Sequence, residues 1–183
     1  MIPFNKKDLY SIPNILGYFR LLMIPVFLFL YLTASTPKEY YSAVAIFGIS
    51  AVTDFLDGFI ARKFHMVTEL GKALDPIADK LTHGAVIFCL CTKYQWMWLL
   101  AGLFVIKEGF MAIMGIVNLS HGKMLNGAKW FGKLCTAVLF LTSFILLLFP
   151  SILLRAVNVM ILTNAVIMIV TLILYIRVFK AMK

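Results

Sequence analysis

Six long apolar segments run along the chain, separated by short breaks that carry charged residues, Pro or Gly. A helix needs about 20 apolar residues to cross the hydrocarbon core of a bilayer. The pattern therefore predicts six transmembrane helices, at residues 12–32, 40–60, 70–92, 96–119, 130–148 and 153–179. Residues 1–10 are too few to cross, and they mix aromatic side chains with Lys and Asp, which is typical of a segment lying on the membrane surface.

The composition agrees with this pattern. Hydrophobic residues make up 62% of the chain and charged residues 14%, whereas soluble globular chains have roughly 45–50% and about 25%. The expected fold class is all-α, a polytopic membrane protein with six transmembrane helices and a short N-terminal interfacial segment. Disordered, fibrous and nucleic-acid-binding classes are excluded. The net charge of +9 then indicates contact with anionic membrane lipids, and we expect no nucleic-acid partner.

The Lys and Arg residues near the segment ends fall mostly on one side of the predicted membrane, and such residues favour the cytoplasm. That side collects Lys6, Lys7, Arg62, Lys63, Lys72, Lys123, Lys129, Lys133, Arg177, Lys180 and Lys183, against Lys38, Lys93 and Arg155 on the other. We therefore expect a multi-pass protein of the cell membrane with both termini in the cytoplasm. The chain shows no repeat or linker, so residues 1–183 are predicted to form one domain.

Acidic residues are rare, 8 in the chain, yet four aspartates lie inside or at the ends of the second and third segments. An unpaired charge there costs at least about 2.5–3.5 kcal/mol. Asp54 and Asp57 are spaced i,i+3, and Asp75 and Asp79 i,i+4, so each pair shares one helix face. A short connection makes the two helices antiparallel neighbours, so we expect the four carboxylates to converge. A cluster of oxygen ligands favours Mg²⁺ or Mn²⁺, and we expect two ions.

Another interpretation is that each aspartate pairs with a nearby base such as Arg62, Lys72 or Lys80, but it does not explain the shared faces. Gly58 and Gly71 lie beside these acids. A helical Gly allows a phosphate or sugar to approach the backbone closely, and it allows close helix packing equally well. The sequence leaves these two alternatives open for each Gly.

These residues form a pattern that resembles the signature of the CDP-alcohol phosphotransferases, D-x2-DG-x2-AR-x8-G-x3-D-x3-D. The matching positions are Asp54, Asp57, Gly58, Ala61, Arg62, Gly71, Asp75 and Asp79. The resemblance implies six transmembrane helices with the active site at the cytoplasmic face. It also implies an enzyme that transfers the phosphatidyl group of CDP-diacylglycerol to an alcohol and releases CMP.

The resemblance further implies roles for individual residues. Asp54, Asp57 and Asp75 would ligate metal, and Asp79, also near the second ion, would be the base that accepts the proton of the attacking hydroxyl. The residues assigned to the CDP-linked lipid are Gly58, Ala61, Arg62, Gly71, Asn14 and Arg20.

Two further stretches are similar to the phosphatidylglycerophosphate synthase branch of the family. Residues 12–20 are similar to its P-N-x2-T-x2-R opening, with Gly17 in place of Thr. Residues 132–136 are similar to its G-K-x-K-T stretch, with Cys135 in place of the second Lys. This similarity favours glycerol 3-phosphate as the acceptor.

Three cations are candidates for binding an acceptor phosphate: Lys107, Lys129 and Lys133. Lys107 and Glu108 point about 100° apart on a helix, so we expect them not to neutralise each other and to border a wet cavity. Lys129 and Lys133 have an alternative role as cytoplasmic anchors that extend to the interface. Family resemblance and the small six-helix body suggest a homodimer.

Other functions remain open from the sequence. A cardiolipin synthase of the same superfamily would use phosphatidylglycerol, and another relative would use inositol phosphate. Acids inside membrane segments also mark the ion paths of cation or proton transporters. That class, however, predicts acids near the bilayer midplane and an inverted repeat, and neither is apparent here.

Overall fold

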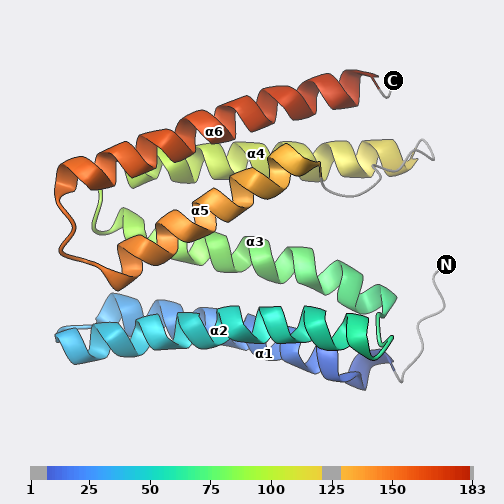
Figure 1. Cartoon of the computed structure of the whole chain (residues 1–183), viewed down its shortest axis with the longest axis horizontal. Helices are drawn as coiled ribbons and strands as arrows, with labels where there is room; N and C mark the ends of the chain where they lie inside the picture. The colour runs from blue at the N-terminus through green and yellow to red at the C-terminus, as the bar shows by residue number, and fades with distance from the viewer. Residues whose placement is uncertain (1–7, 121–128, 182–183) are drawn as a thin grey trace. The chain divides into compact units, whose positions relative to one another are not determined.

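A computed structural model describes residues 8–120 and 129–181 and consists of helices (Figure 1). The helices are η1 Asp8–Tyr10, α1 Ile12–Thr33, α2 Pro37–Lys63, α3 Glu69–Cys91, α4 Met97–Ser120, α5 Trp130–Leu148 and α6 Leu154–Ala181. The chain divides into two compact units, Met1–Cys89 and Leu90–Lys183. Most of the predicted surface segment, together with Lys6, Lys7, Lys123 and Lys183, lies outside the described residues.

The all-α prediction is confirmed, but among the described residues five helices rather than six are long and apolar enough to cross a membrane. They are α1, α2, α4, α5 and α6. The helix α3 is not among them because Asp75, Asp79 and Lys80 make its first half polar. The residues that suggest an active site are thus the ones that weaken the membrane signal of this helix.

In the first unit, α1 packs along α2, and the two lie side by side in Figure 1. Their contact is aromatic near the connection between them: the Phe27 ring lies 5.8 Å from that of Phe47, and Tyr31 lies 5.5 Å from Tyr40. Helix α2 begins three residues earlier than predicted because Thr36 forms a capping box with Glu39, which satisfies backbone N–H groups at the helix start.

The end of α2 reverses the chain toward α3. The Met66 N–H donates to the Ala61 carbonyl at 3.0 Å, and His65 takes a left-handed φ of 53°. This pattern is a Schellman motif, in which a left-handed residue, most often Gly, ends a helix and a backbone N–H closes on the last turn. His65 therefore has a structural position in the turn that brings α3 back toward the acids of α2.

In the second unit, α6 packs against both α4 and α5. The Asn164 side-chain amide on α6 donates to the Thr142 hydroxyl on α5 at 2.7 Å, and both side chains are buried. Interhelical hydrogen bonds of this kind stabilise the association of helices in membranes. Gly132 lies so close to Tyr175 that a Cβ atom would collide with the tyrosine hydroxyl. Gly132 thus permits the close approach of α5 and α6.

Candidate active site

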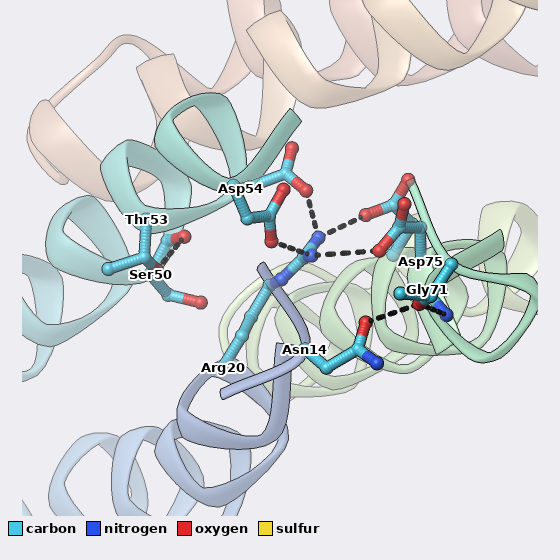
Figure 2. A network of polar contacts seen from close by, with 10 residues as sticks. Asn14, Arg20, Ser50, Thr53, Asp54, Gly71 and Asp75 are labelled. Carbon is cyan, nitrogen blue, oxygen red and sulfur yellow. Dashed lines mark hydrogen bonds and ion pairs between the residues drawn. The ribbon is translucent and has the colours of Figure 1, made fainter. Parts of the chain in front are cut away.

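Arg20 lies at the centre of the aspartate cluster. Its side chain extends from α1 between α2, which carries Asp54, and α3, which carries Asp75 (Figure 2). The Nη1 atom donates to Asp54 and, at 2.7 Å, to Asp79. The Nη2 atom donates to Asp57 at 2.6 Å and lies 3.8 Å from Asp75. The planar guanidinium presents several N–H donors in a fixed fork, so it can serve several carboxylates at once.

The expectation that the four carboxylates converge is met, but through a third helix that sequence spacing did not identify. They gather around a guanidinium from α1 rather than directly between α2 and α3. The base they share is therefore Arg20, which is 34 positions from Asp54 and 59 from Asp79. Residues so far apart in sequence carry no periodicity that would reveal the contact.

The four acids differ in exposure, which suggests different tasks. The Asp57 side chain is 5% exposed, whereas those of Asp54, Asp75 and Asp79 are 47%, 52% and 48% exposed. A buried carboxylate is tolerated when it is paired and hydrogen-bonded, and Asp57 has Arg20 for this purpose. The other three carboxylates are open to a ligand that arrives from outside the protein.

The donor set suits a hard cation. Four carboxylates supply the oxygen ligands that Mg²⁺ and Mn²⁺ prefer, and the guanidinium among them shows that this arrangement attracts positive charge. Among the side chains that the structure describes, no three from His, Cys, Asp or Glu are spaced to hold one ion directly.

A hydrogen-bonded chain joins α1 to the beginning of α3. The Thr68 hydroxyl donates to the Asn14 side-chain oxygen at 3.0 Å and accepts the Gly71 N–H at 2.9 Å (Figure 2). A Cβ atom on Gly71 would lie 2.8 Å from the Asn14 oxygen and 3.1 Å from the Thr68 hydroxyl. Gly71 is thus needed for close packing, one of the two alternatives that the sequence left open.

Thr68 is a residue of this contact that was not predicted from the sequence. Thr68 stands directly before α3, which begins at Glu69, one residue earlier than the expected 70, and its hydroxyl accepts a backbone N–H of the first turn, as is typical of an N-cap. Asn14, assigned by resemblance to the CDP-linked lipid, is 2% exposed and contacts Thr68. In this structure it ties α1 to α3.

Arg62 and Gly58 lie together on α2. A Cβ atom on Gly58 would lie 3.4 Å from both terminal nitrogens of Arg62, whose side chain is exposed. The missing side chain of Gly58 leaves room for this guanidinium on the surface of α2, one residue after Asp57. Gly58 thereby gives space to an exposed cation on α2, the helix that also carries Asp54 and Asp57.

The second unit carries the three candidate lysines. The Lys107 Nζ lies 2.6 Å from a Glu108 carboxylate oxygen, and the two side chains are 7% and 18% exposed. The expectation that these neighbours do not neutralise each other was wrong, because the long Lys side chain bends back although the two Cα–Cβ bonds diverge. Lys129 is half-buried before α5, and Lys133 on α5 is exposed.

The two departures from the family pattern have different surroundings. Cys135 is 2% exposed on α5, whereas a Cβ atom on Gly17 would meet nothing within 4 Å, although Gly17 is itself buried. A larger side chain therefore fits at position 17 more easily than a Lys fits at position 135.

Comparison with known proteins agrees with the site. The sequence model of the CDP-alcohol phosphatidyltransferases matches residues 10–177. The chain belongs to the CDP-alcohol phosphatidyltransferase family. It is thus a membrane phosphatidyltransferase, not the ion transporter considered from its acids alone. Enzymes of this family generally use divalent metal ions.

Several relatives have names that specify one reaction within the family. The CDP-diacylglycerol–glycerol-3-phosphate 3-phosphatidyltransferases of Escherichia coli (strain K12), Shigella flexneri serotype 5b (strain 8401) and Shigella boydii serotype 4 (strain Sb227) are similar to this family member. Each is 32% identical over 130 residues, which cover 69% of this chain and 71% of the relative.

Proposed function

We propose that this protein transfers the phosphatidyl group of CDP-diacylglycerol to glycerol 3-phosphate and releases CMP. The observation that carries the proposal is the gathering of all four motif aspartates at one site. The activity named for the bacterial relatives supports glycerol 3-phosphate as the acceptor. The reaction joins the acceptor hydroxyl oxygen to the phosphorus of the phosphatidyl group. It breaks the bond between that phosphorus and the oxygen of CMP, which leaves.

Asp54, Asp57, Asp75 and Asp79 are the proposed metal ligands, for two Mg²⁺ or Mn²⁺ ions. Such ions neutralise charge on the diphosphate oxygens and orient donor and acceptor for in-line transfer. The chemistry of the donor set fits this role, because all four groups are carboxylates and three of them are about half exposed.

Asp79 is the proposed general base. A hydroxyl is a weak nucleophile near neutral pH, and a carboxylate within hydrogen-bond reach accepts its proton as the new bond forms. The Asp79 side chain is 48% exposed, so an acceptor can approach it. Its contact with Arg20 at 2.7 Å holds one carboxylate oxygen and fixes the orientation of the group.

The CDP-linked donor is assigned to Gly58, Ala61, Arg62, Gly71, Asn14 and Arg20. Arg62 is the exposed cation of this set and is suited to pair with a diphosphate oxygen. Asn14 and Gly71 contribute by holding the start of α3 against α1. This arrangement places Asp75, one turn farther along α3, toward Arg20.

Lys107, Lys129 and Lys133 are the proposed acceptor cations. A phosphate monoester carries close to two negative charges at neutral pH, so it favours a site with more than one cation. Lys133 is the exposed residue of the three, so its replacement should disturb helix packing least. We expect Lys133→Ala to raise the Michaelis constant for glycerol 3-phosphate about 10-fold and to change that for the CDP-lipid little.

The finer arrangement in the membrane is also proposed. We infer that α3 is a sixth membrane span, that residues 1–183 form one catalytic domain, and that both termini and the active site face the cytoplasm. The family match across both units supports one domain. We further propose a homodimer; an active monomer in native mass measurements from mild detergent would contradict it.

The decisive experiment supplies the purified protein with CDP-diacylglycerol, a divalent metal and a panel of alcohols, and identifies the lipid formed by mass spectrometry. We expect phosphatidylglycerophosphate from glycerol 3-phosphate. A product with four acyl chains from phosphatidylglycerol would identify a cardiolipin synthase, and a product from inositol phosphate would identify that relative. Either result would overturn the acceptor assignment and leave the transfer chemistry intact.

A further inference from the structure

The position of Arg20 bears on how the site takes up metal. Its guanidinium lies among the four carboxylates with a side chain that is 2% exposed. It donates to Asp57 at 2.6 Å and to Asp79 at 2.7 Å, and it also contacts Asp54 and Asp75. It therefore lies between oxygens of all four proposed metal ligands, where an ion shared by these oxygens would also lie.

A guanidinium and a metal ion cannot use these oxygens in the same way at the same time. Mg²⁺ binds carboxylate oxygens at about 2.0–2.1 Å and requires near-octahedral geometry. The oxygens of Asp57 and Asp79 that contact Arg20 point instead at N–H groups 2.6 and 2.7 Å away. Because Nη1 contacts both Asp54 and Asp79, an ion that bridges these two oxygens would take its place, and the guanidinium must withdraw or turn.

The charges in the cluster make such an exchange favourable. In the ion pairs of the described residues, four carboxylates share the single charge of Arg20, so this guanidinium alone does not neutralise them. In addition, the Arg20 Nε–H is buried and has no hydrogen-bond partner among the described residues. The guanidinium therefore neutralises the carboxylates only in part, and one of its own N–H donors stays unsatisfied. A divalent ion carries more positive charge and can neutralise more of the carboxylate charge.

We propose that Arg20 is the built-in counter-cation of the metal-free site, and that divalent metal displaces its guanidinium from the carboxylates. This inference rests on the proposed metal site. Without metal, the acids on α2 and α3 repel each other. The positive charge of Arg20 offsets this repulsion and holds the two helices together. After displacement, the same guanidinium is available to the donor diphosphate, since Arg pairs with phosphate as well as with carboxylate.

Metal binding in the absence of CDP-lipid tests the exchange. The full-length protein in lipid nanodiscs is titrated with Mn²⁺, and free Mn²⁺ is followed by its electron paramagnetic resonance signal. Removing an internal competitor should tighten binding, so we expect Arg20→Gln to lower the Mn²⁺ dissociation constant at least about 10-fold, which is about 1.4 kcal/mol.

Arg62→Gln is the matched control. It removes the same charge from an exposed position beside Gly58, and the described residues show no ion pair between Arg62 and the four acids. Because exposed charges are screened at physiological salt, we expect less than about a 3-fold change. Equal tightening in both variants would reveal a general charge effect and overturn the exchange.

Measurements of thermal stability distinguish a counter-cation role of Arg20 from an ordinary structural role. In chelator, Arg20→Gln should melt at least about 5 °C below the unmodified protein, because four acids lose their partner. Saturating Mn²⁺ should remove most of this deficit. A deficit that persists in Mn²⁺, or Mn²⁺ affinity no higher than that of the unmodified protein, would overturn the proposal.

Arg20→Lys covers the case in which Arg20→Gln does not fold. A single ammonium keeps the charge but cannot contact as many carboxylates, so we expect at least about 3-fold tighter Mn²⁺ binding; unchanged or weaker binding would contradict the exchange. If the unmodified protein binds no Mn²⁺ at all, the proposed metal site fails as well. If it binds Mn²⁺ and neither Arg20 variant binds more tightly, only the exchange fails.

Discussion

Replacing Gly71 by Ala tests whether the beginning of α3 is held by close contact with α1. The added methyl carbon would lie 2.8 Å from the Asn14 side-chain oxygen and 3.1 Å from the Thr68 hydroxyl. Both distances are shorter than ordinary van der Waals contact. Asn14 is 2% exposed and hydrogen-bonded to Thr68, so its amide cannot turn away freely. The methyl group must therefore push α1 and α3 apart or break the hydrogen bonds.

The magnitude follows from opposing effects. Overpacking a buried contact costs about 1–3 kcal/mol, and a lost N-cap costs about 0.5–2 kcal/mol. Ala favours a helix over Gly by about 1 kcal/mol, which offsets part of this. We expect Gly71→Ala to destabilise the protein by about 2 kcal/mol and lower its melting temperature by about 4–8 °C. We also expect a clear loss of CMP release, because Asp75 and Asp79 move with α3.

Gly17→Ala is the control within α1, since a Cβ atom there meets nothing within 4 Å. It should leave the melting temperature unchanged or raise it slightly. Thermal unfolding in nanodiscs, monitored by circular dichroism, measures both variants. In an Asn14→Ala background, Gly71→Ala should cost at least about 1 kcal/mol less, because the colliding group is gone. A Gly71→Ala protein as stable and active as the unmodified one would refute this account of Gly71.

Two further predictions concern the chemistry, and a third concerns the ion pair between Lys107 and Glu108. Chelation should abolish CMP release, and Mg²⁺ or Mn²⁺ should restore it while Ca²⁺ does so poorly, because Ca²⁺ coordination is longer and looser; full activity in excess chelator would exclude a metal requirement. Asp79→Asn should lower turnover at least about 10²-fold with CDP-lipid binding still detectable, the usual scale for a lost general base, whereas Asp57→Asn should instead weaken binding of donor and metal. Lys107→Ala should destabilise the protein by about 1.5–3 kcal/mol, because it removes the buried ammonium that pairs with the Glu108 carboxylate at 2.6 Å; Lys107→Met combined with Glu108→Gln should be more stable than Lys107→Ala when both are compared in thermal unfolding.

The sequence determined the features that depend on neighbouring positions. Helix length follows from runs of apolar residues, because each membrane helix must satisfy its own backbone hydrogen bonds within lipid. The i,i+3 and i,i+4 spacings likewise assign each aspartate pair to one helix face. Even the early start of α2 was readable, since Thr36 and Glu39 form a standard capping pattern.

One contact between residues adjacent in the sequence was nevertheless predicted wrongly. Lys107 and Glu108 leave the helix in different directions, yet the flexible Lys side chain closes the gap to 2.6 Å. Backbone geometry fixes where a side chain begins, but the rotamers of a long side chain depend on the low-dielectric surroundings that reward pairing. Such surroundings are a property of the packed helices.

Only the tertiary structure decided what joins the aspartates. Arg20 meets Asp79 across 59 positions, and Asn14 meets Thr68 across 54. The identity of these residues could be noted from the sequence, but not which polar groups would face them. Inside a membrane protein, each buried charge or amide must find a partner, and the partner is the group that helix packing brings within hydrogen-bond distance. The choice of partner therefore depends on how α1, α2 and α3 pack, which the spacing of residues along one helix does not encode.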